Sequence, residues 1–439
     1  MSFFGPISTP ALDEAYMPLI RRAFYHARVV GNFAAVQAAV QLVGFLSGIL
    51  LVRWLPERQY AYFTIANSMQ STINILADIG IGVGLISIGG RVWQDRHRFG
   101  ELIKTGLSVR RKLGAAAIII VTPIMCFMLL RNGASVFYTS LLSVAVIAGL
   151  VFQFSVGVLN VVPRLRSDVG RIQIIDFTAA SVRLLLVAGL IFIFATAGVA
   201  VTIATAVFFL QYLMLRRYVN RVVDLNVSEN EEDRREIVRL TKHLAANSVF
   251  YCLQGQITVF LISLFAHRVS AIAEIGALGR LAMIFTILSN LLTNVFVPAF
   301  ARCQDRRKLA WLYFLIVSGV FVFSGVIFAG AAIFPTQFLF VLGSKYAHLH
   351  RELLLIVGVT VISAITGTFW SLNASKAWVS GAWLYIPLTL VTQIALIPFF
   401  DFSKVSDVLT FTLLSNAPNL LLNFAMTYRG FRTFRPSVA

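Results

Sequence analysis

Five ionisable side chains lie inside or at the ends of long apolar stretches of this sequence: Asp78, Asp176, Arg183, Glu274 and Arg280. On insertion scales, an ionised side chain near the centre of a bilayer costs at least ~2.5 to 3.5 kcal/mol, so each is expected to face a cavity or a partner charge on another helix. Asp176 and Arg183 are seven residues apart, or two helical turns, and therefore share one helix face. The charges predict either a polar binding site or ion pairs that fix helix packing.

A polar stripe accompanies the first of these charges, between Tyr60 and Gly90. This run of 31 residues contains no Lys or Arg and is long enough to cross the roughly 30 Å hydrocarbon core as one helix. Its polar residues recur at spacings of three, four and four, and therefore lie on one helix face: Asn67, Gln70, Asn74 and Asp78. Because unpaired polar groups that face lipid are costly, we expect the stripe to point into a helix bundle or a water-filled cavity.

The arginines of these stretches have the chemistry of an anion site. A guanidinium group offers paired donors to phosphate oxygens and stays charged at any accessible pH. The sequence therefore predicts a cationic substrate cavity, with Arg183 and Arg280 at depth and Arg53 and Arg268 near its exterior mouth. An anionic headgroup is the expected cargo.

The amides and acids of the same stretches have predicted roles beside the arginines. Three amides of the stripe complete the predicted lining of the cavity: Asn67, Gln70 and Asn74. Asp78, Asp176 and Glu274 are predicted to couple conformational change or a cation, although Asp176 and Glu274 also fall close to the predicted ends of spans. The alternative is internal ion pairing, for instance of Asp78 with an arginine, in a purely structural role.

No catalytic or metal-binding constellation is found in the sequence. Gly80, Gly82 and Gly84 form a glycine run, but it lies within a span and lacks the strand, turn and helix of a phosphate-binding loop, so close helix packing explains it better. His348 and His350 are two residues apart, which is a poor pattern for metal ligands. We therefore expect no enzyme, no metal and no cofactor, apart from H⁺ or Na⁺ as a coupling ion.

Membrane helices must position these residues. The chain has 439 residues, of which 58% are hydrophobic and 13% charged, and its mean hydropathy of +0.82 is far outside the range of soluble domains. The formal charge of +18 does not indicate a nucleic-acid partner, because the charges sit in short loops between apolar spans. Hydropathy windows predict twelve spans, at about 31–52, 60–90, 114–130, 136–159, 173–195, 198–215, 244–266, 272–300, 309–332, 352–375, 378–399 and 405–427.

The distribution of basic residues predicts the orientation. With the N-terminus in the cytoplasm, cytoplasmic segments carry 28 of the 37 Lys and Arg residues and the opposite face carries 7. This asymmetry favours twelve spans and two cytoplasmic termini. The predicted domains are a cytoplasmic interfacial segment, a six-helix bundle, a charged cytoplasmic linker, a second six-helix bundle and a cytoplasmic tail: 1–30, 31–215, 216–243, 244–427 and 428–439.

Two finer predictions accompany this division. Residues 229–244 are interpreted as a surface helix with solvated charges, or as a simple linker, and residues 16–30 as an interfacial helix. A shift of 215 residues superposes span one on span seven and aligns Asn32 with Asn247 and Gln41 with Gln256. Two related six-helix halves are therefore a hypothesis.

Several short motifs resemble a known family. Leu51–Phe63, LVRWLPERQYAYF, resembles the start of the second helix in polysaccharide flippases of the multidrug, oligosaccharidyl-lipid and polysaccharide exporter superfamily, with Ala61 where glycine is usual. Asp78–Gly82 is similar to the Asp-x-Gly that ends that helix. Glu274–Gly276 and Val297–Arg302 resemble the family's eighth helix and its proline-containing exit.

The resemblance implies an all-α polytopic membrane protein of about twelve transmembrane helices, arranged as two pseudo-symmetric six-helix bundles around a central cavity. It implies a flippase that moves a polyprenyl-pyrophosphate-linked oligosaccharide to the periplasmic leaflet of the bacterial inner membrane by alternating access. Arg183 and Arg280 would attract the pyrophosphate, and Asp78 would couple a cation or a conformational change. Expected partners are the bilayer, the lipid-linked oligosaccharide, glycosyltransferases and a polysaccharide polymerase.

Two alternatives of other kinds remain open at this point. A cation-coupled drug or small-solute antiporter of the same superfamily would favour acidic cavity residues, against which two arginines at depth argue. A membrane polysaccharide polymerase or ligase would need a sizeable exterior domain, whereas the longest exterior loop, residues 334–351, is short.

Overall fold

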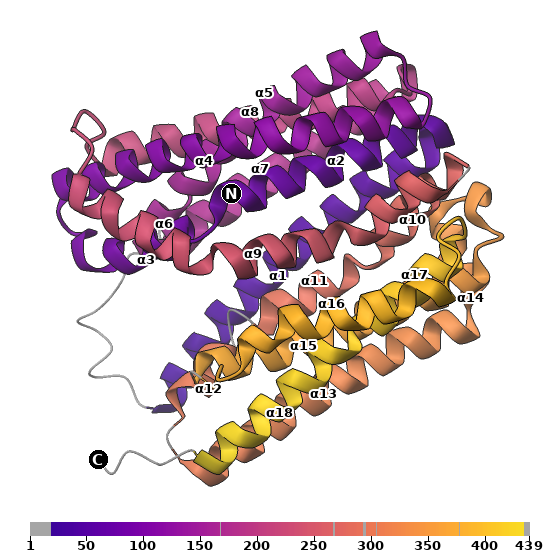
Figure 1. Cartoon of the computed structure of the whole chain (residues 1–439). Coiled ribbons are helices and arrows are strands. Elements are labelled where there is room, and N and C mark those ends of the chain that lie inside the picture. Colours follow the sequence, from indigo (N-terminus) through magenta and orange to yellow (C-terminus); the bar gives the residue numbers. More distant parts are fainter. Residues whose placement is uncertain are drawn as a thin grey trace. The chain divides into compact units, whose positions relative to one another are not determined.

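The computed structural model describes residues 19–166, 168–266, 268–292, 296–303, 305–376 and 378–433. Within these ranges every regular element is helical (Figure 1). In this described part of the chain, eleven helices are long and apolar enough to cross a membrane, and the count rises to twelve with the bent pair Glu57–Asp78 and Ile81–Val92. The prediction of an all-α polytopic membrane protein is confirmed.

The chain divides into two compact units, which are described separately below. Unit 1 comprises Met1–Gln254 and unit 2 comprises Gly255–Ala439. The helix α9, Glu231–Phe265, contains this boundary. The second part of the predicted linker 216–243 is helical, as the predicted surface helix requires: it is the first third of α9 and belongs to unit 1.

Unit 1 is built from long helices that pack side by side. Its helices before α9 are α1 Leu19–Trp54, α2 Glu57–Asp78, α3 Ile81–Val92, α4 Arg96–Arg131, α5 Val136–Leu159, α6 Val161–Leu165, α7 Val169–Leu186 and α8 Ala197–Val222. The main packing partners are α5 with α8 and α2 with α4. An apolar cluster that includes Leu85, Phe99 and Val219 fills the space between α3, α4 and α8.

Local sequence explains where these helices begin. The carboxylate of Asp95 accepts hydrogen bonds from the backbone N–H groups of His97 (2.9 Å) and Arg98 (3.1 Å), which satisfies the free donors at the start of α4. Ser135 and Thr196 cap α5 and α8 in the same way. With 36 residues, α4 is about 54 Å long, so it extends beyond the hydrocarbon core.

The predicted single helix from Tyr60 to Gly90 is wrong, because the chain breaks between α2 and α3 with a bend of 43°. Gly80 adopts φ 74°, a left-handed conformation that glycine accepts readily. A Cβ atom at Gly80 would lie 2.9 Å from the Cα of Thr241, and one at Gly84 would lie 3.1 Å from Cγ1 of Ile237. The glycine run therefore serves close packing of α3 on α9, as the sequence indicated.

The bent pair nevertheless reaches from one end of unit 1 to the other. Near the start of α2, the Arg58 guanidinium donates to the carbonyl of Gly133, in the loop after α4. Near the end of α3, Arg91 forms an ion pair of 3.0 Å with Glu236, beside the start of α4. Because these contacts lie at opposite ends of α4, α2 and α3 together are long enough for one crossing, which brings the candidate crossings among the described residues to the predicted twelve.

Two predicted boundaries of the chain termini also change. The described part of the predicted interfacial segment, residues 19–30, is continuous with the first span as the single helix α1. Residues 16–18 of that segment lie outside the described residues. At the other end, the last helix continues to Thr433, past the predicted end at 427, and 434–439 lie outside the described residues.

Unit 2 has shorter and more interrupted helices. They are α10 Ser270–Leu281, α11 Ile284–Leu291, α12 Val297–Arg302, α13 Arg306–Ile333, α14 Pro335–Leu342, α15 His350–Ser375, α16 Tyr385–Leu396, α17 Val405–Ser415 and α18 Ala417–Thr433. Its apolar core lies where α13 and α15 pack together, and includes Phe300, Leu309 and Leu372.

The element order agrees with the proposed repeat. A shift of 215 residues carries α5 onto 351–374, which coincides with α15, and carries α7 onto 384–401, which contains α16. Superposition of the two units remains a prediction, and Thr293, which the shift aligns with Asp78, lies outside the described residues.

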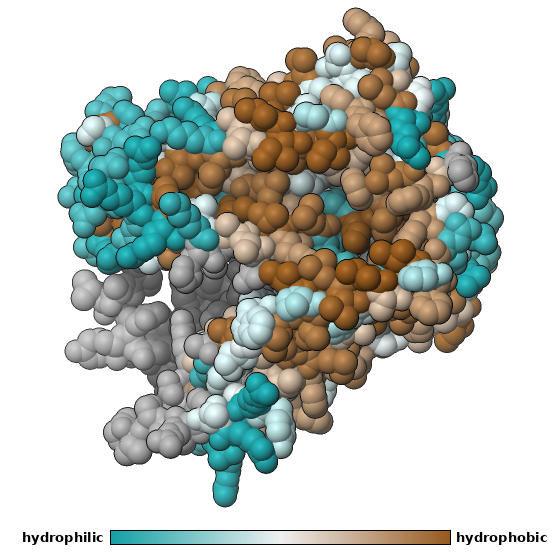
Figure 2. All heavy atoms as spheres, in the orientation of Figure 1, coloured by the Kyte–Doolittle hydropathy of each residue, from teal (hydrophilic) through white to brown (hydrophobic). Residues whose placement is uncertain are grey.

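Large apolar side chains cover the outer surface of both units. Figure 2 shows hydrophobic side chains over the middle of unit 1, between hydrophilic residues that gather at its two ends. Phe137 of unit 1 and Phe399 of unit 2 are each 79% exposed. Such a surface is stable in lipid and would aggregate in water, so it supports the membrane assignment.

Candidate functional site

An arginine that the sequence analysis did not select forms the centre of the polar site in unit 1. Nη1 of Arg110, on α4, lies 3.0 Å from Oδ1 of Asp78, and its Nη2 donates to Oδ1 of Asn74 at 3.1 Å. The Arg110 side chain is only 5% exposed. Gly157 on α5 makes the space, because a Cβ atom there would overlap the guanidinium group. The predicted alternative of an Asp78–arginine ion pair is thus observed.

The Arg110 guanidinium keeps one unused donor. Its Nε atom is buried and has no hydrogen-bond partner among the described residues. A buried donor without a partner is costly, so this group has capacity for one more acceptor.

Three of the four residues in the polar stripe of α2 contact neighbouring helices. Nε2 of Gln70 donates to Oε1 of Gln153 on α5 at 3.2 Å. Asn74 and Asp78 contact Arg110 as described. Asn67 is exposed, and its carbonyl accepts a hydrogen bond of 2.8 Å from the Ser71 hydroxyl. The prediction that the stripe points into a bundle therefore holds for Gln70, Asn74 and Asp78.

Further charges extend this polar face. Arg164, at the end of α6, lies close enough to interact electrostatically with both Asp78 and Asp176. Asp176 and Arg183 stand on α7 and are partly buried. Four helices of unit 1, α2, α4, α6 and α7, therefore bring two arginines, Arg110 and Arg164, and two carboxylates, Asp78 and Asp176, to one polar region.

Two predicted site residues of unit 2 lie on α10. Glu274 is only 6% exposed, and its Oε1 lies 3.8 Å from Nε2 of His348 in the loop before α15. Arg280 is partly buried and precedes the break between α10 and α11, where Met283 N–H donates to the Arg280 carbonyl at 3.1 Å. The eighth predicted span is thus interrupted next to its arginine.

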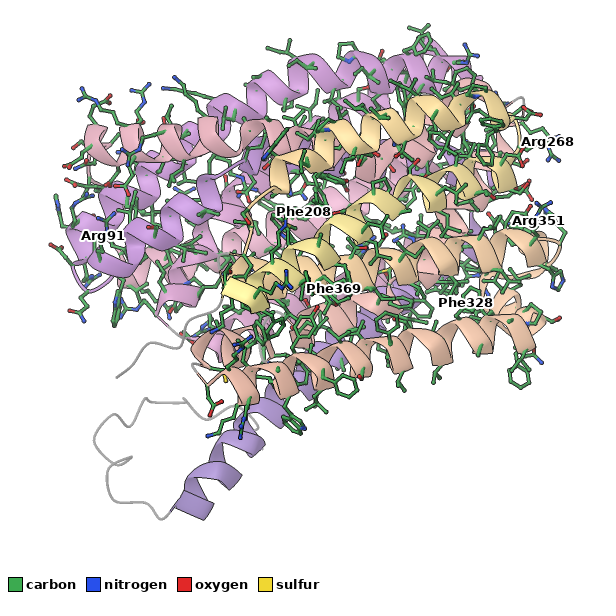
Figure 3. The ribbon with its side chains drawn as sticks, turned by 60° about the horizontal axis from the view of Figure 1, so that its bottom comes forward. Arg91, Phe208, Arg268, Phe328, Arg351 and Phe369 are labelled. Carbon is green, nitrogen blue, oxygen red and sulfur yellow. The ribbon has the colours of Figure 1, made fainter. Side chains whose placement is uncertain are left out.

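The two arginines predicted for the exterior mouth are both exposed. Arg53 stands in the last turn of α1, in unit 1. Arg268 precedes α10 in unit 2, where Figure 3 shows it at the same end as Arg351. Because Arg53 and Arg268 belong to different units, their shared mouth remains a prediction.

A buried amide network in unit 2 was not predicted from the sequence. Nδ2 of Asn373, on α15, donates to the carbonyl of Asn423 on α18 at 3.0 Å, and the Thr427 hydroxyl donates to Oδ1 of Asn373 at 2.9 Å. Asn423 also donates to Oδ1 of Asn419 at 2.8 Å. These residues are at most 6% exposed. Their four-residue spacing along α18, at 419, 423 and 427, was the available signal.

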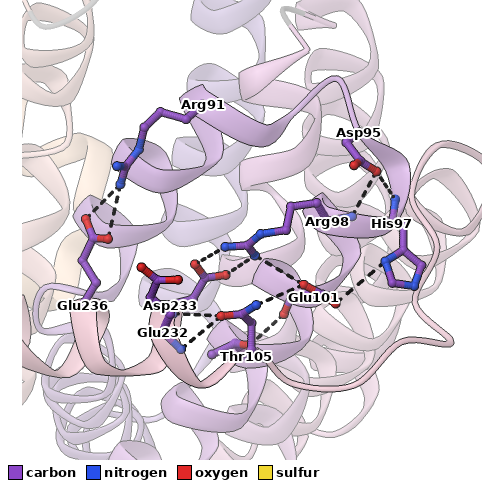
Figure 4. A network of polar contacts seen from close by, with 10 residues as sticks. Arg91, Asp95, His97, Arg98, Glu101, Thr105, Glu232, Asp233 and Glu236 are labelled. Carbon is purple, nitrogen blue, oxygen red and sulfur yellow. Dashed lines mark hydrogen bonds and ion pairs between the residues drawn. The ribbon is translucent and has the colours of Figure 1, made fainter.

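Ion pairs hold the first part of α9 against the start of α4 in unit 1, as Figure 4 shows. Nη1 and Nη2 of Arg98 donate to the two carboxylate oxygens of Asp233 at 2.5 and 2.6 Å, and Asp233 is 2% exposed. Arg91 pairs with Glu236 nearby. The prediction that the charges of 229–244 are all solvated is wrong, because Asp233 is buried by its arginine partner.

No protein-family model and no curated relative matches the chain in sequence. Its structure, however, is similar to those of several solved transporters. An inward-facing multidrug resistance MATE family transporter of the MOP superfamily has a TM-score of 0.62 at 16% identity, covering 92% of this chain and 100% of that one. The fold is that of the MOP superfamily transporters.

Two other MOP-fold structures show how broad the similarity is. The lipid II flippase MurJ, in an inward closed conformation, has a TM-score of 0.68 at 11% identity, covering 91% of this chain and 89% of that one. A MOP superfamily transporter from Pyrococcus furiosus has a TM-score of 0.61 at 17% identity, covering 92% and 94%. At these identities the similarity establishes the MOP fold, and the cargo has to be argued from the site.

Arg110 was not predicted from the sequence because hydropathy places it before the predicted third span at 114. The structure continues α4 through both regions, so Arg110 is a buried helix residue. Gly106 and Gly114, four residues before and after it, both contact neighbouring side chains closely. An arginine between two such glycines on one helix face was the signal for a buried side chain.

Proposed function

We propose that this protein is a flippase for a polyprenyl-pyrophosphate-linked oligosaccharide. It moves the lipid-linked sugar from the cytoplasmic to the periplasmic leaflet of a bacterial inner membrane by alternating access. The product would feed the synthesis of exopolysaccharide, capsule or O-antigen, with glycosyltransferases and a polysaccharide polymerase as functional partners. Both termini would lie in the cytoplasm.

The buried guanidinium of Arg110 carries the proposal. Arg110 contacts Asp78 at 3.0 Å, and its Nε donor has no hydrogen-bond partner among the described residues. Arg164 interacts electrostatically with Asp78 and Asp176, and Arg183 lies two turns along α7 from Asp176. Arginines at membrane depth suit an anionic group, and a guanidinium suits a phosphate in particular.

The fold supports a cargo that is carried on a lipid. Among the solved structures with the same fold, one is a lipid II flippase. Sugar hydroxyls and phosphates do not cross hydrocarbon unaided, so a transporter must supply polar groups in place of their water. The stripe of Gln70, Asn74 and Asp78 and the partly buried Arg183 are groups of this kind.

We assign pyrophosphate attraction to Arg183 and Arg280, and coupling to Asp78. Protonation of Asp78, or Na⁺ binding to it, would weaken its attraction for Arg110 and leave the buried guanidinium available to an anion. Asp176 and Glu274 are further proposed coupling groups. H⁺ and Na⁺ are the candidate ions.

The experiment is the double substitution Arg183→Ala/Arg280→Ala in a strain that depends on this protein for surface polysaccharide. We expect surface polysaccharide to fall to the level of a deletion strain while the amount of protein in the membrane stays normal. Arg131→Ala, at the far exposed end of α4, is the matched control and should have no effect. Normal polysaccharide in the double variant would overturn the assignment.

A drug or small-solute antiporter is the second candidate, because an inward-facing multidrug MATE transporter has the same fold. The buried carboxylate of Glu274 would attract a cationic solute. Drug resistance that requires Glu274 and is unchanged by Arg183→Ala/Arg280→Ala would favour this candidate.

A further inference from the structure

A basic pocket lies beside the first half of α4, on a helix face that does not include Arg110. One face of α4 supplies Lys104, Leu107, Ser108, Arg111 and Lys112, which recur at helical spacing. The segment between α8 and α9 supplies the opposite wall with Leu225 and Glu229. The pocket has a volume of about 440 Å³, enough for a phosphate-bearing headgroup.

The segment that forms the opposite wall is held in place by α4. The Lys104 ammonium donates to the carbonyl of Val227. The backbone N–H of Asn230 donates to the Thr105 hydroxyl at 2.9 Å, and its side chain donates to Oε2 of Glu101 at 3.2 Å. The pocket is therefore largely preformed, which lowers the entropic cost of binding a ligand.

The pocket holds more positive than negative charge, because Lys104, Arg111 and Lys112 line it together with one carboxylate, Glu229. Arg111 and Lys112 are exposed, and neither has an ion-pair partner in the described part of the chain. Other arginines nearby behave differently: Arg91, Arg98 and Arg234 each pair with a carboxylate. Acidic residues are thus available at this end of unit 1, and the charge in the pocket is left over for an external anion.

The position of these charges along α4 matches the layer of lipid phosphates. The apolar part of α4 begins at Leu113, directly after Lys112. A headgroup layer is about 5–7 Å thick on each side of the hydrocarbon core, which is about four residues of helix. Arg111 and Lys112 therefore fall within it, Ser108 lies at its outer edge, and Lys104 lies outside.

We propose that this pocket binds the phosphate group of a lipid headgroup at the membrane surface. The Arg111 fork and the Lys112 ammonium hold the phosphate oxygens, and the Ser108 hydroxyl donates a further hydrogen bond. Leu107 and Leu225 contact the apolar part of the lipid next to the phosphate. The lipid is either an anionic glycerophospholipid or a polyprenyl pyrophosphate, and only the second source rests on the proposed flippase function.

The test measures lipid binding to the purified full-length protein in neutral detergent. The probes are phosphatidylglycerol, undecaprenyl pyrophosphate and inorganic pyrophosphate, titrated by native mass spectrometry and thermal stabilisation. Arg111→Gln/Lys112→Gln should weaken binding of the preferred lipid by about ten-fold or more. The control, Arg217→Gln/Arg221→Gln, removes the same charge from exposed residues of α8 that do not line the pocket, and should change binding less than two-fold.

A third variant distinguishes loss of binding from loss of folding. Ser108→Asp keeps every basic residue, adds an anion to the pocket and should weaken binding as strongly as the double variant, with an unchanged elution profile. Stronger binding of phosphatidylglycerol identifies a membrane phospholipid, and stronger binding of undecaprenyl pyrophosphate identifies a place where cargo is first held.

Three outcomes would overturn the proposal: equal weakening by the α8 control, tighter binding of inorganic pyrophosphate than of either lipid, or no specific binding at all. Failure here is distinguishable from failure of the flippase proposal. Arg183→Ala/Arg280→Ala should leave phosphatidylglycerol binding to the pocket unchanged, whatever it does to polysaccharide.

Discussion

At the scale of single residues, the contact between Asp78 and Arg110 has two readings, because an ion pair can fix packing or serve transport. Removing one partner of a buried pair leaves the other charge uncompensated, whereas removing both can be nearly neutral. Asp78→Asn alone should therefore lower the free energy of unfolding by about 1–3 kcal/mol, a range that allows for the partial exposure of Asp78. Asp78→Asn/Arg110→Gln should recover most of that loss.

The double variant separates the two readings. Thermal unfolding in detergent reports stability, and surface polysaccharide reports transport. We expect stability to return while polysaccharide stays low, since a coupling carboxylate cannot be replaced by an amide. If stability and polysaccharide return together, Asp78 and Arg110 have only a structural role.

A second residue, Asp305, predicts a pH dependence outside the membrane. Its carboxylate accepts hydrogen bonds from the backbone N–H groups of Arg307 (2.8 Å) and Lys308 (3.2 Å) at the start of α13. The bonds from Lys308 and Arg307 lower the pKa of Asp305 from its ordinary 3.8. A lowered pKa contributes stability above the unfolded value, and this contribution is lost as pH falls through the folded value.

Asp305→Asn should therefore lower the thermal midpoint at about pH 6, by an amount that shrinks as the pH approaches about 3. The control is Ser135→Ala, which removes an uncharged cap from α5 and should cost the same at both pH values. A cost of Asp305→Asn that does not change with pH would contradict the assigned role of the carboxylate.

At the scale of elements, the break between α2 and α3 depends on one glycine. Gly80 combines φ 74° with an approach of 2.9 Å between its Cβ position and Thr241 Cα. Gly80→Ala should lower stability by about 2 kcal/mol or more, since it adds backbone strain and a clash. Gly90→Ala, in the same α3, is the matched control because a Cβ atom there meets nothing within 4 Å. Equal effects of the two substitutions on the unfolding midpoint would contradict this account.

The sequence predicted a span well where the apolar run and the helix have the same bounds, and less well where the helix extends beyond the apolar run. The predicted span 136–159 matches α5 residue for residue, because capping by Ser135 and the apolar run begin together. The helix around Arg110 was missed because α4 continues through charged residues that end a hydropathy window. The break at Gly80 and the burial of Asp233 depend on α9, whose contacts are far away in sequence.

At the scale of the whole molecule, the number of crossings depends on the bent pair, since eleven other helices qualify by themselves. The contact of Arg58 with Gly133 and that of Arg91 with Glu236 lie at opposite ends of α4, which favours α2 and α3 together as one crossing. Four long helices, α4, α5, α7 and α8, separate residue 93 from the segment before α9. The N-terminus and Ser228 should therefore lie on the same side of the membrane.

Cysteine labelling tests this prediction. In a variant without Cys126, Cys252 and Cys303, an impermeant maleimide added to intact cells should label Ser344→Cys and spare Ser228→Cys and an N-terminal cysteine. Labelling of the N-terminal cysteine with protection of Ser228→Cys would show that α2 and α3 form a re-entrant loop.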